Sequence, residues 1–256
     1  ALWLAVESGH VQEAVLNGQT ILPNGEWWID KGIHLYDIQK LVKNGKNQVI
    51  LTYHIPKTER KGALEETFET ERNRFFYEVE PESIYVRGFF DVVRREQSFV
   101  LTDPTPKQLG NLTIQGMPFY RGNCFYEGIV NYDGESLLAV RLSGMEGTAA
   151  RIFVDETEAG MVIEKEGKCD LTPYLRKGDN LLRVELLGHN RNLLGPHHHI
   201  RKKLYFVGPN SFDGTWGFAD FVNPEITPGS STWTGEYSFV PFGIQQIYLE
   251  KGRKEQ

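Results

Sequence analysis

Three consecutive histidines, His197, His198 and His199, form the densest group of side chains in the sequence that could bind a metal or transfer a proton. In an extended segment His197 and His199 would face one side and His198 the other. Two imidazoles on one side could be half of a zinc site, with His189 nearby, but a third ligand at a fixed spacing is missing. We therefore expect a loop whose histidines hydrogen-bond locally or line a groove, and the sequence leaves a metal site unassigned.

Tryptophans in turn-rich segments are the second chemical feature. Trp27 and Trp28 follow a Pro-Asn-Gly turn, and Trp216 and Trp233 each follow a turn that contains glycine. Sugar rings stack their apolar C–H faces on flat aromatic surfaces, while polar neighbours bind the hydroxyl groups. Each tryptophan could instead fill the end of a sandwich or a domain interface. The residues predicted to contact a ligand are Trp27, Trp28, His197, His199, Trp216 and Trp233.

Carboxylates are too numerous for the sequence alone to identify a catalytic pair. A glycosidase needs two carboxyl groups about 5–9.5 Å apart, one of them with a raised pKa. The chain has 34 acidic residues, and pairs such as Glu65-Glu66 or Glu78 and Glu80 stand in charged stretches typical of solvated faces. The sequence also lacks a serine nucleophile motif, a glycine-rich phosphate loop and a paired CxxC. We therefore predict no catalytic residue.

Charge and composition exclude several kinds of partner. With 28 basic and 34 acidic residues the formal charge is −6, which argues against nucleic acid or an anionic membrane surface as a partner. No segment approaches the ~20 apolar residues that a membrane helix needs. Two cysteines, Cys124 and Cys169, are too few for a disulfide framework. They predict two separate thiols, with a single bridge as the alternative.

The pattern of apolar residues predicts an all-β fold. Short segments rich in Val, Ile, Leu, Tyr and Phe alternate with turn signals, and 26 glycines and 12 prolines separate them. Many short strands of this kind are typical of a β-sandwich or barrel. Helix signals are sparse, and the best helical candidate is residues 63–77.

An internal repeat predicts two copies of one β-domain. Residues 36–49 match residues 169–182, so that Asp37 corresponds to Asp170. In each copy the aspartate can cap a short turn, a glycine permits positive φ, and an asparagine suits the turn into the next strand. Residues 15–18 and 153–156 form a second, weaker pair in the same order.

The boundary between the two domains is expected near the two prolines at 104 and 106. We predict a first domain at 1–98 and a second at 99–256. The chain begins without methionine in a segment that already predicts a strand and does not match a signal peptide. We therefore expect the first domain to be truncated and the chain to be a piece of a longer protein, and the cellular compartment stays unassigned.

A set of sequence blocks spread over most of the chain resembles one group of sugar-binding domains. The blocks are residues 15–18, 27–30, 36–38 with 45–47, 85–90, 115–122, 170–171 with 178–180, and 192–198. They resemble galactose-binding-like jelly-roll domains attached to large glycoside hydrolases, in particular the C-terminal region of rhamnosidase-like family 106 enzymes and family 2-like proteins. The resemblance implies two tandem galactose-binding-like jelly-roll β-sandwiches, which often carry a structural calcium ion, and no other cofactor.

The resemblance also implies a function. In such enzymes the catalytic carboxylates lie in a separate barrel domain, and none of these blocks belongs to it. We therefore predict a non-catalytic accessory or carbohydrate-binding region whose partner is a carbohydrate or the catalytic barrel of the parent protein. The alternatives are a purely structural interaction domain without a ligand and a self-contained glycoside hydrolase. If a sugar binds, we expect Trp216 or Trp233 to be partly exposed in a groove beside a histidine.

Overall fold

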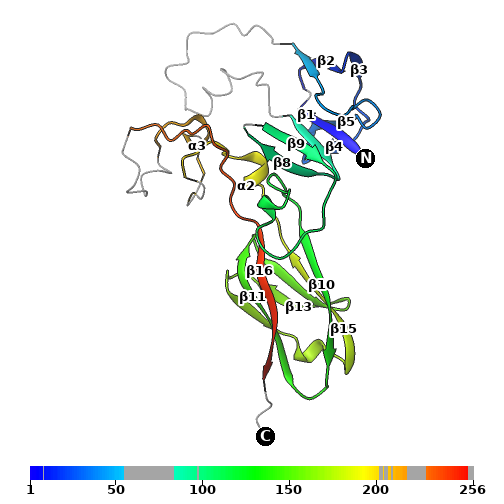
Figure 1. Ribbon diagram of the computed structural model, residues 1–256, viewed down its shortest axis with the longest axis vertical. Helices are drawn as coiled ribbons and strands as arrows, with labels where there is room; N and C mark the ends of the chain where they lie inside the picture. The colour runs from blue at the N-terminus through cyan, green and yellow to red at the C-terminus, as the bar shows by residue number, and fades with distance from the viewer. Residues whose placement is uncertain are drawn as a thin grey trace. The chain divides into compact units, whose positions relative to one another are not determined.

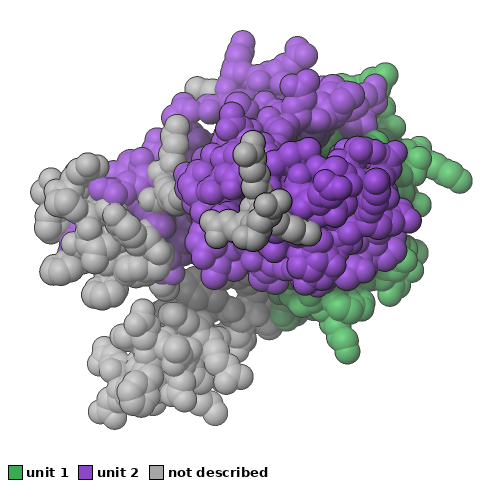
Figure 2. All heavy atoms as spheres, turned by 90° about the horizontal axis from the view of Figure 1, so that it is seen from below, with its two compact units in different colours: residues 1–90 green, residues 91–256 purple. Residues whose placement is uncertain are grey.

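The computed structural model describes residues 1–7, 9–54, 84–96, 98–201, 204, 207–208, 210–217 and 229–252. These residues form antiparallel sheets with only short helical turns, which confirms the predicted all-β sandwich class (Figure 1). The helix expected over 63–77 lies outside the described residues. The chain divides into two compact units, residues 1–90 and 91–256 (Figure 2). The division into two domains at residue 98 stays a prediction.

The first unit contains two antiparallel sheets, with the strand orders β4-β5-β1-β7 and β3-β2-β6. Its strands are β1 (Leu2–Glu7), β2 (Val11–Leu16), β3 (Gln19–Ile21), β4 (Trp27–Trp28), β5 (Asp30–Asp37), β6 (Val49–Tyr53) and β7 (Tyr85–Gly88). Leu4 and Val6 of β1 pack against Leu16 of β2 and Tyr36 of β5 in the core. Because side chains alternate along a strand, Trp3 and Ala5 lie on the opposite, outer face of β1.

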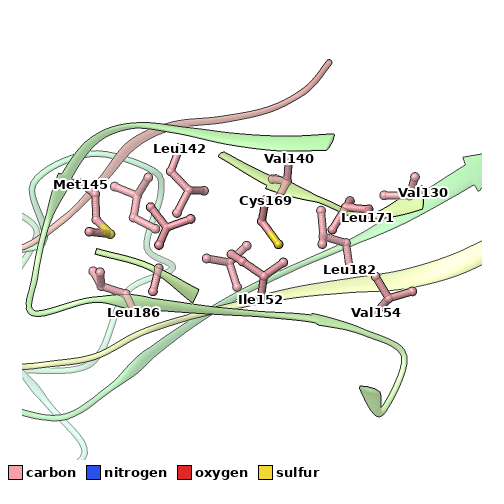
Figure 3. Packing of buried hydrophobic residues seen from close by; sticks show 14 of the residues in the cluster. Val130, Val140, Leu142, Met145, Ile152, Val154, Cys169, Leu171, Leu182 and Leu186 are labelled. Carbon is pink, nitrogen blue, oxygen red and sulfur yellow. The ribbon is translucent and has the colours of Figure 1, made fainter. Parts of the chain in front are cut away.

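The second unit also contains a four-stranded and a three-stranded sheet, with the orders β10-β15-β12-β13 and β14-β11-β16. Their strands are β10 (Cys124–Tyr132), β11 (Leu137–Glu146), β12 (Ala150–Val154), β13 (Thr157–Val162), β14 (Gly167–Asp170), β15 (Gly178–Leu186) and β16 (Gly243–Gly252). Figure 3 shows Val140 and Leu142 of β11 pointing toward Ile152 of β12 and Leu186 of β15, so the core lies between the two sheets. Both cysteines are free thiols.

The second unit also contains shorter elements, which precede β10 or connect the strands of this sandwich. They are the hairpin β8 (Asp91–Arg95) and β9 (Ser98–Thr102), the 3-10 turns η1 (Leu112–Ile114) and η2 (Thr172–Tyr174), and the helices α2 (Arg191–Leu194) and α3 (Asn210–Asp213). No helix within the described ranges is long and apolar enough to cross a membrane. The stretch between α2 and β16 carries the histidines and two of the predicted tryptophans.

The two units share one strand topology. The order β5-β1-β7 in the first unit corresponds to β14-β11-β16 in the second, and β3-β2-β6 corresponds to β13-β12-β15. The matching sequence blocks 36–49 and 169–182 run in each unit from the end of the β5 or β14 strand to the β6 or β15 strand. In the second unit β10 adds a further strand beside β15.

The predicted capping role of the two aspartates is confirmed. Asp37 Oδ1 accepts the backbone N–H of Gln39 (3.0 Å), and Asp170 Oδ1 accepts that of Thr172 (2.9 Å). A side-chain carboxylate in this position binds an N–H group that the following turn leaves without a backbone partner. The two copies of the block therefore begin with the same local structure.

The second pair of repeated blocks also matches in detail. Asn17 and Asp155 both have positive φ, 51° and 50°, a conformation that asparagine and aspartate tolerate better than most residues. Each Oδ1 accepts a backbone N–H, Asn17 from Gln48 just before β6 (3.0 Å) and Asp155 from Leu181 within β15 (2.9 Å). The carbonyls of these same two residues accept the backbone N–H groups of Asn17 and Asp155.

Candidate functional site

The histidine segment of the second unit pairs with a segment that holds Trp233. Residues 197–200 and 232–238 run antiparallel to each other. The backbone hydrogen bonds between them are Thr234 N to His198 O (2.8 Å), Ser238 N to His197 O (2.6 Å) and Ile200 N to Thr232 O (2.7 Å). Two segments more than 30 residues apart in the sequence are therefore fixed side by side.

Asn192 anchors the histidine segment. Its fully buried side chain accepts the N–H of Val240 and donates to the carbonyl of Val240, both at 2.9 Å. Its own carbonyl accepts a hydrogen bond from Nε2 of His197 at 2.9 Å. Since a carbonyl only accepts, the proton of this imidazole lies on Nε2. One asparagine therefore holds both sides of the loop pair.

His197 belongs to an aromatic cluster. Its ring lies 5.6–5.9 Å from those of Phe119, Tyr237 and Phe239, and Phe99 packs edge-on against the same three rings. Burial among these rings lowers the pKa of His197, although the hydrogen bond with the Asn192 carbonyl works in the opposite direction. The imidazole is therefore neutral at pH 7 and acts as a core aromatic for the loops.

Trp233, His198 and Tyr237 form a partly exposed group that we call the Trp233 ledge. The indole is 53% exposed and stacks on the His198 ring, with 5.5 Å between centroids and 21° between planes. The ring of Tyr237 also packs against His198, with 4.7 Å between the ring centroids. Nδ1 of His198 is hydrogen-bonded to the backbone carbonyl of Thr234 at 3.1 Å. The second histidine of the triplet thus meets the tryptophan, where the sequence favoured the first and third.

His199 and Trp216 do not share the exposure of Trp233. His199 is fully buried; its Nδ1 accepts the N–H of Arg201 and its carbonyl accepts the Ser238 hydroxyl. Burial therefore removes His199 from the expected ligand contacts, because its side chain does not reach the surface. Trp216 is half-buried, two residues beyond the glycine that packs against Trp233.

In the first unit, Trp27 borders a surface depression. The depression is lined by Trp3, Gly25, Glu26, Trp27, Leu35 and Arg87. Trp27 is 53% exposed, whereas its neighbour Trp28 is half-buried and packs edge-on against Tyr85 at 5.5 Å. The two adjacent tryptophans therefore have different environments, and only Trp27 offers an open indole.

Among the described residues, each carboxyl group with a shifted pKa has that pKa lowered. Hydrogen bonds from neighbouring hydroxyl, arginine or backbone N–H groups lower the pKa of five of them: Asp133, Glu158, Glu166, Asp213 and Glu250. At Asp91 burial alone would raise the pKa, but hydrogen bonds from Lys107 and Thr105 and the lysine charge lower it. A general acid for glycoside hydrolysis needs a pKa shifted upward.

Metal-binding residues do not gather in the part of the chain that the structure describes. No group of three or more His, Cys, Asp or Glu side chains there is placed to hold an ion. The imidazoles of His197 and His198 bond to different carbonyls, those of Asn192 and Thr234. A structural calcium ion, which uses loop carbonyls as well as carboxylates, stays a prediction.

Sequence reasoning missed Trp3 and Arg87. Trp3 stands in an apolar strand and looks like a core residue, and Arg87 lies more than 80 residues away in the chain. The alternation of β1 was the available signal, since core-facing Leu4 and Val6 imply that Trp3 faces outward. The approach of Arg87 depends on the pairing of β1 with β7, which no local motif encodes.

Comparisons with known proteins give only distant likenesses. No protein-family model matches the sequence, and no curated protein matches it. A glycosyl hydrolase family 2 member from Bacteroides cellulosilyticus is similar over 64% of this chain and 18% of its own, at 14% identity and TM-score 0.31. A rhamnosidase from Novosphingobium sp. PP1Y is similar over 98% and 23%, at 12% identity and TM-score 0.38. A β-glucuronidase from an uncultured Clostridium sp. is similar over 53% and 23%, at 17% identity and TM-score 0.26. The chain spans about a fifth of the length of these structures, and the proposals below rest on the residues of the sites.

Proposed function

We propose that the chain is a non-catalytic accessory region of a glycoside hydrolase that binds carbohydrate through exposed aromatic side chains. The observation that carries this proposal is the Trp233 ledge, where a half-exposed indole stacks on His198. A flat indole face held on a fixed loop can stack on the C–H face of a sugar without first losing side-chain freedom. The ledge is therefore suited to a sugar ring.

Polar groups beside the ledge supply the second half of sugar recognition. Because the Thr234 carbonyl only accepts, Nδ1 of His198 donates this hydrogen bond, and Nε2 is the second polar atom of the ring. Glu236, three residues beyond Trp233, pairs with Arg94 at 2.6 Å on an exposed surface. Hydroxyl groups need donors and acceptors of this kind around an aromatic platform.

The accessory role is supported by the sequence blocks that resemble galactose-binding-like domains. The galactose-binding-like identity of the two sandwiches and the barrel domain as their partner belong to the same proposal.

One observation favours a second function, that of an interaction domain. Phe125 and Ile129 project from the same face of the edge strand β10 and are 59% and 66% exposed. An edge strand with exposed apolar side chains is a common protein contact surface. This face could dock another domain of the parent protein.

The test is affinity electrophoresis of the chain in gels that contain soluble polysaccharides, for wild type, Trp233→Ala and Phe125→Ala. We expect at least one polysaccharide to retard the wild type and Phe125→Ala, and Trp233→Ala to lose about 1–3 kcal/mol of affinity, by analogy with base stacking on aromatic side chains. Retardation that Trp233→Ala leaves unchanged would argue against the ledge.

The enzymatic alternative is tested on the same preparation. We expect no turnover of aryl-glycosides by the purified chain. Turnover that survived repurification and disappeared with a single glutamate substitution would establish a self-contained hydrolase instead.

A further inference from the structure

The depression beside Trp27 lies on the outer face of the sheet β4-β5-β1-β7. Trp3 and Ala5 face outward from β1, and Leu35 of β5 pairs directly with Ala5, so it lies on the same face. Leu35 is almost fully buried, and it lines the depression together with Trp3 and Trp27. The site therefore contains two indoles and an aliphatic side chain.

Arg87 adds a positive charge to this depression. It pairs directly with Trp3 across β1 and β7, and its guanidinium carbon lies 5.4 Å from the centre of the Trp3 ring. The indole face attracts the cation at this distance, while the N–H groups of the guanidinium stay able to donate hydrogen bonds. Trp3 thus keeps the charge of Arg87 beside the depression.

Arg87 differs from most other arginines of the sheets in its pairing. Arg141, Arg151 and Arg183 of the second unit each form an ion pair with a glutamate. Arg87 has no carboxylate partner among the residues that the structure describes. A planar guanidinium with free donors binds a carboxylate through two parallel hydrogen bonds.

Glu26 is the acidic group of the depression. Its carboxylate accepts a hydrogen bond from Nδ2 of Asn24 at 3.2 Å, and its N–H donates to Oδ1 of the same asparagine at 2.9 Å. The turn therefore holds Glu26 at the rim of the site. A carboxylate here accepts hydrogen bonds from hydroxyl groups and repels a second negative charge on the ligand.

We infer that this depression binds a sugar ring that carries one carboxylate, a uronic acid. Arg87 would bind the carboxylate, Trp27 would stack on the ring face, and Glu26 would accept hydroxyl hydrogen bonds. The inference rests on the proposed function only in taking a sugar as the ligand, because the site lies in the first unit and shares no residue with the Trp233 ledge.

The experiment compares uronic acids with their neutral counterparts by isothermal titration of the full chain. The probes are methyl glucuronide against methyl glucoside, and methyl galacturonide against methyl galactoside. We expect the wild type to bind the acidic member of at least one pair at least tenfold more tightly, with an affinity that falls as salt is added. Arg87→Gln should weaken uronide binding roughly tenfold to a hundredfold, since a charge-assisted bidentate pair is lost.

Two further variants make the result specific to geometry. Arg87→Lys keeps the positive charge but loses the two parallel N–H donors of the guanidinium group. Its affinity for uronides should therefore lie between those of the wild type and Arg87→Gln. Arg176→Gln removes an exposed arginine of the second unit and should leave the preference for uronides unchanged. Circular dichroism and the unfolding midpoint establish that each variant is folded.

The outcomes separate this inference from the proposed function. Neutral sugars that bind through Trp233, with uronides gaining nothing from Arg87, would overturn the inference and leave the proposed function standing. Uronide binding that depends on Arg87 but not on Trp233 would support the inference and would overturn the proposed role of the Trp233 ledge in sugar binding. Binding of neither kind of sugar would overturn both.

Discussion

Asn47 and Asn180 make the same three hydrogen bonds to the turn that precedes each of them. Each Oδ1 accepts the backbone N–H of the residue four positions earlier, and each Nδ2 donates to the carbonyl of that residue and of the intervening glycine. The distances are 2.9 Å, 2.8 Å and 3.1 Å for Asn47 with Lys43 and Gly45, and 3.0 Å, 2.8 Å and 2.9 Å for Asn180 with Arg176 and Gly178. An asparagine side chain thus closes an equivalent turn in each of the two units.

The two asparagines should differ in their effect on stability. Asn180 is 1% exposed whereas Asn47 lies on the surface. Replacing a buried partner leaves backbone groups unsatisfied away from water, so Asn180→Ala should cost about 1–3 kcal/mol of unfolding free energy. Asn47→Ala should cost less than about 1 kcal/mol, because water replaces the lost bonds. Urea unfolding of both variants checks this, and equal costs would contradict it.

Local turn chemistry explains why the repeat could be predicted from sequence. The hydrogen bonds that shape the repeat join residues two to four positions apart; they are those of Asp37, Asp170, Asn47 and Asn180. The structure of each turn therefore depends on residues within the same sequence block. Alternating apolar residues similarly indicated the strands. The extra strand β10 could not be placed, because its pairing with β15 joins segments about 50 residues apart.

The candidate sites were less accessible to sequence reasoning. Loop tryptophans indicated Trp27 and Trp233 because aromatic residues beside glycine turns are locally visible. The choice among the three histidines depended on which faced Trp233, and that is set by the pairing of 197–200 with 232–238. Arg87 was invisible for the same reason, since only the β1–β7 register brings it to Trp3.

Gly214 should control the position of Trp233. It has φ of +77°, and a Cβ on it would lie 2.4 Å from the Cβ of Trp233. Gly214→Ala should therefore displace the indole and reduce polysaccharide retardation as strongly as Trp233→Ala. Gly229→Ala is the matched control, because Gly229 has φ of +80° and nothing within 4 Å of its Cβ position. Both variants carry the backbone strain of about 1 kcal/mol, so only Gly214→Ala should change the retardation and the tryptophan emission.

Asp91 should make the stability of the second unit depend on pH in acid. Its nearly buried carboxylate accepts two hydrogen bonds from Lys107 at 2.6 Å and two from Thr105. Because its pKa is lowered on folding, its contribution is complete above the unfolded pKa of about 3.9 and is lost as pH falls through the folded pKa.

Asp91→Asn tests this linkage. At pH 7 the variant should lose about 1–3 kcal/mol of unfolding free energy, and the difference from wild type should shrink below pH 4. Urea unfolding between pH 7 and pH 2 measures both curves, with Asp103→Asn, an exposed aspartate of the same unit, as control. A difference that stayed constant down to pH 2 would show that the charge of Asp91 is not responsible.

Cys124 should react slowly with thiol reagents. Burial raises the pKa of its thiol to about 11, and burial also raises the pKa of Cys169. At pH 8 only about one Cys124 in a thousand is then thiolate, the reactive form. Native protein should label with iodoacetamide far more slowly than urea-unfolded protein, with a rate that climbs toward pH 11. Rapid labelling of the native protein at pH 8 would contradict the raised pKa of the half-buried Cys124 thiol.

The match between Asn17 and Asp155 has a consequence for chemical ageing. Asn17 precedes Gly18, and an asparagine before glycine is prone to deamidation because the glycine N–H can attack the side-chain amide unhindered. An aspartate product would keep the acceptor toward Gln48, as Asp155 keeps it toward Leu181, but would lose the amide donors to Leu41 (3.0 Å) and Asn47 (2.8 Å). In stored protein this turn of the first unit would thus come to carry an aspartate, as the matching turn of the second unit does at Asp155.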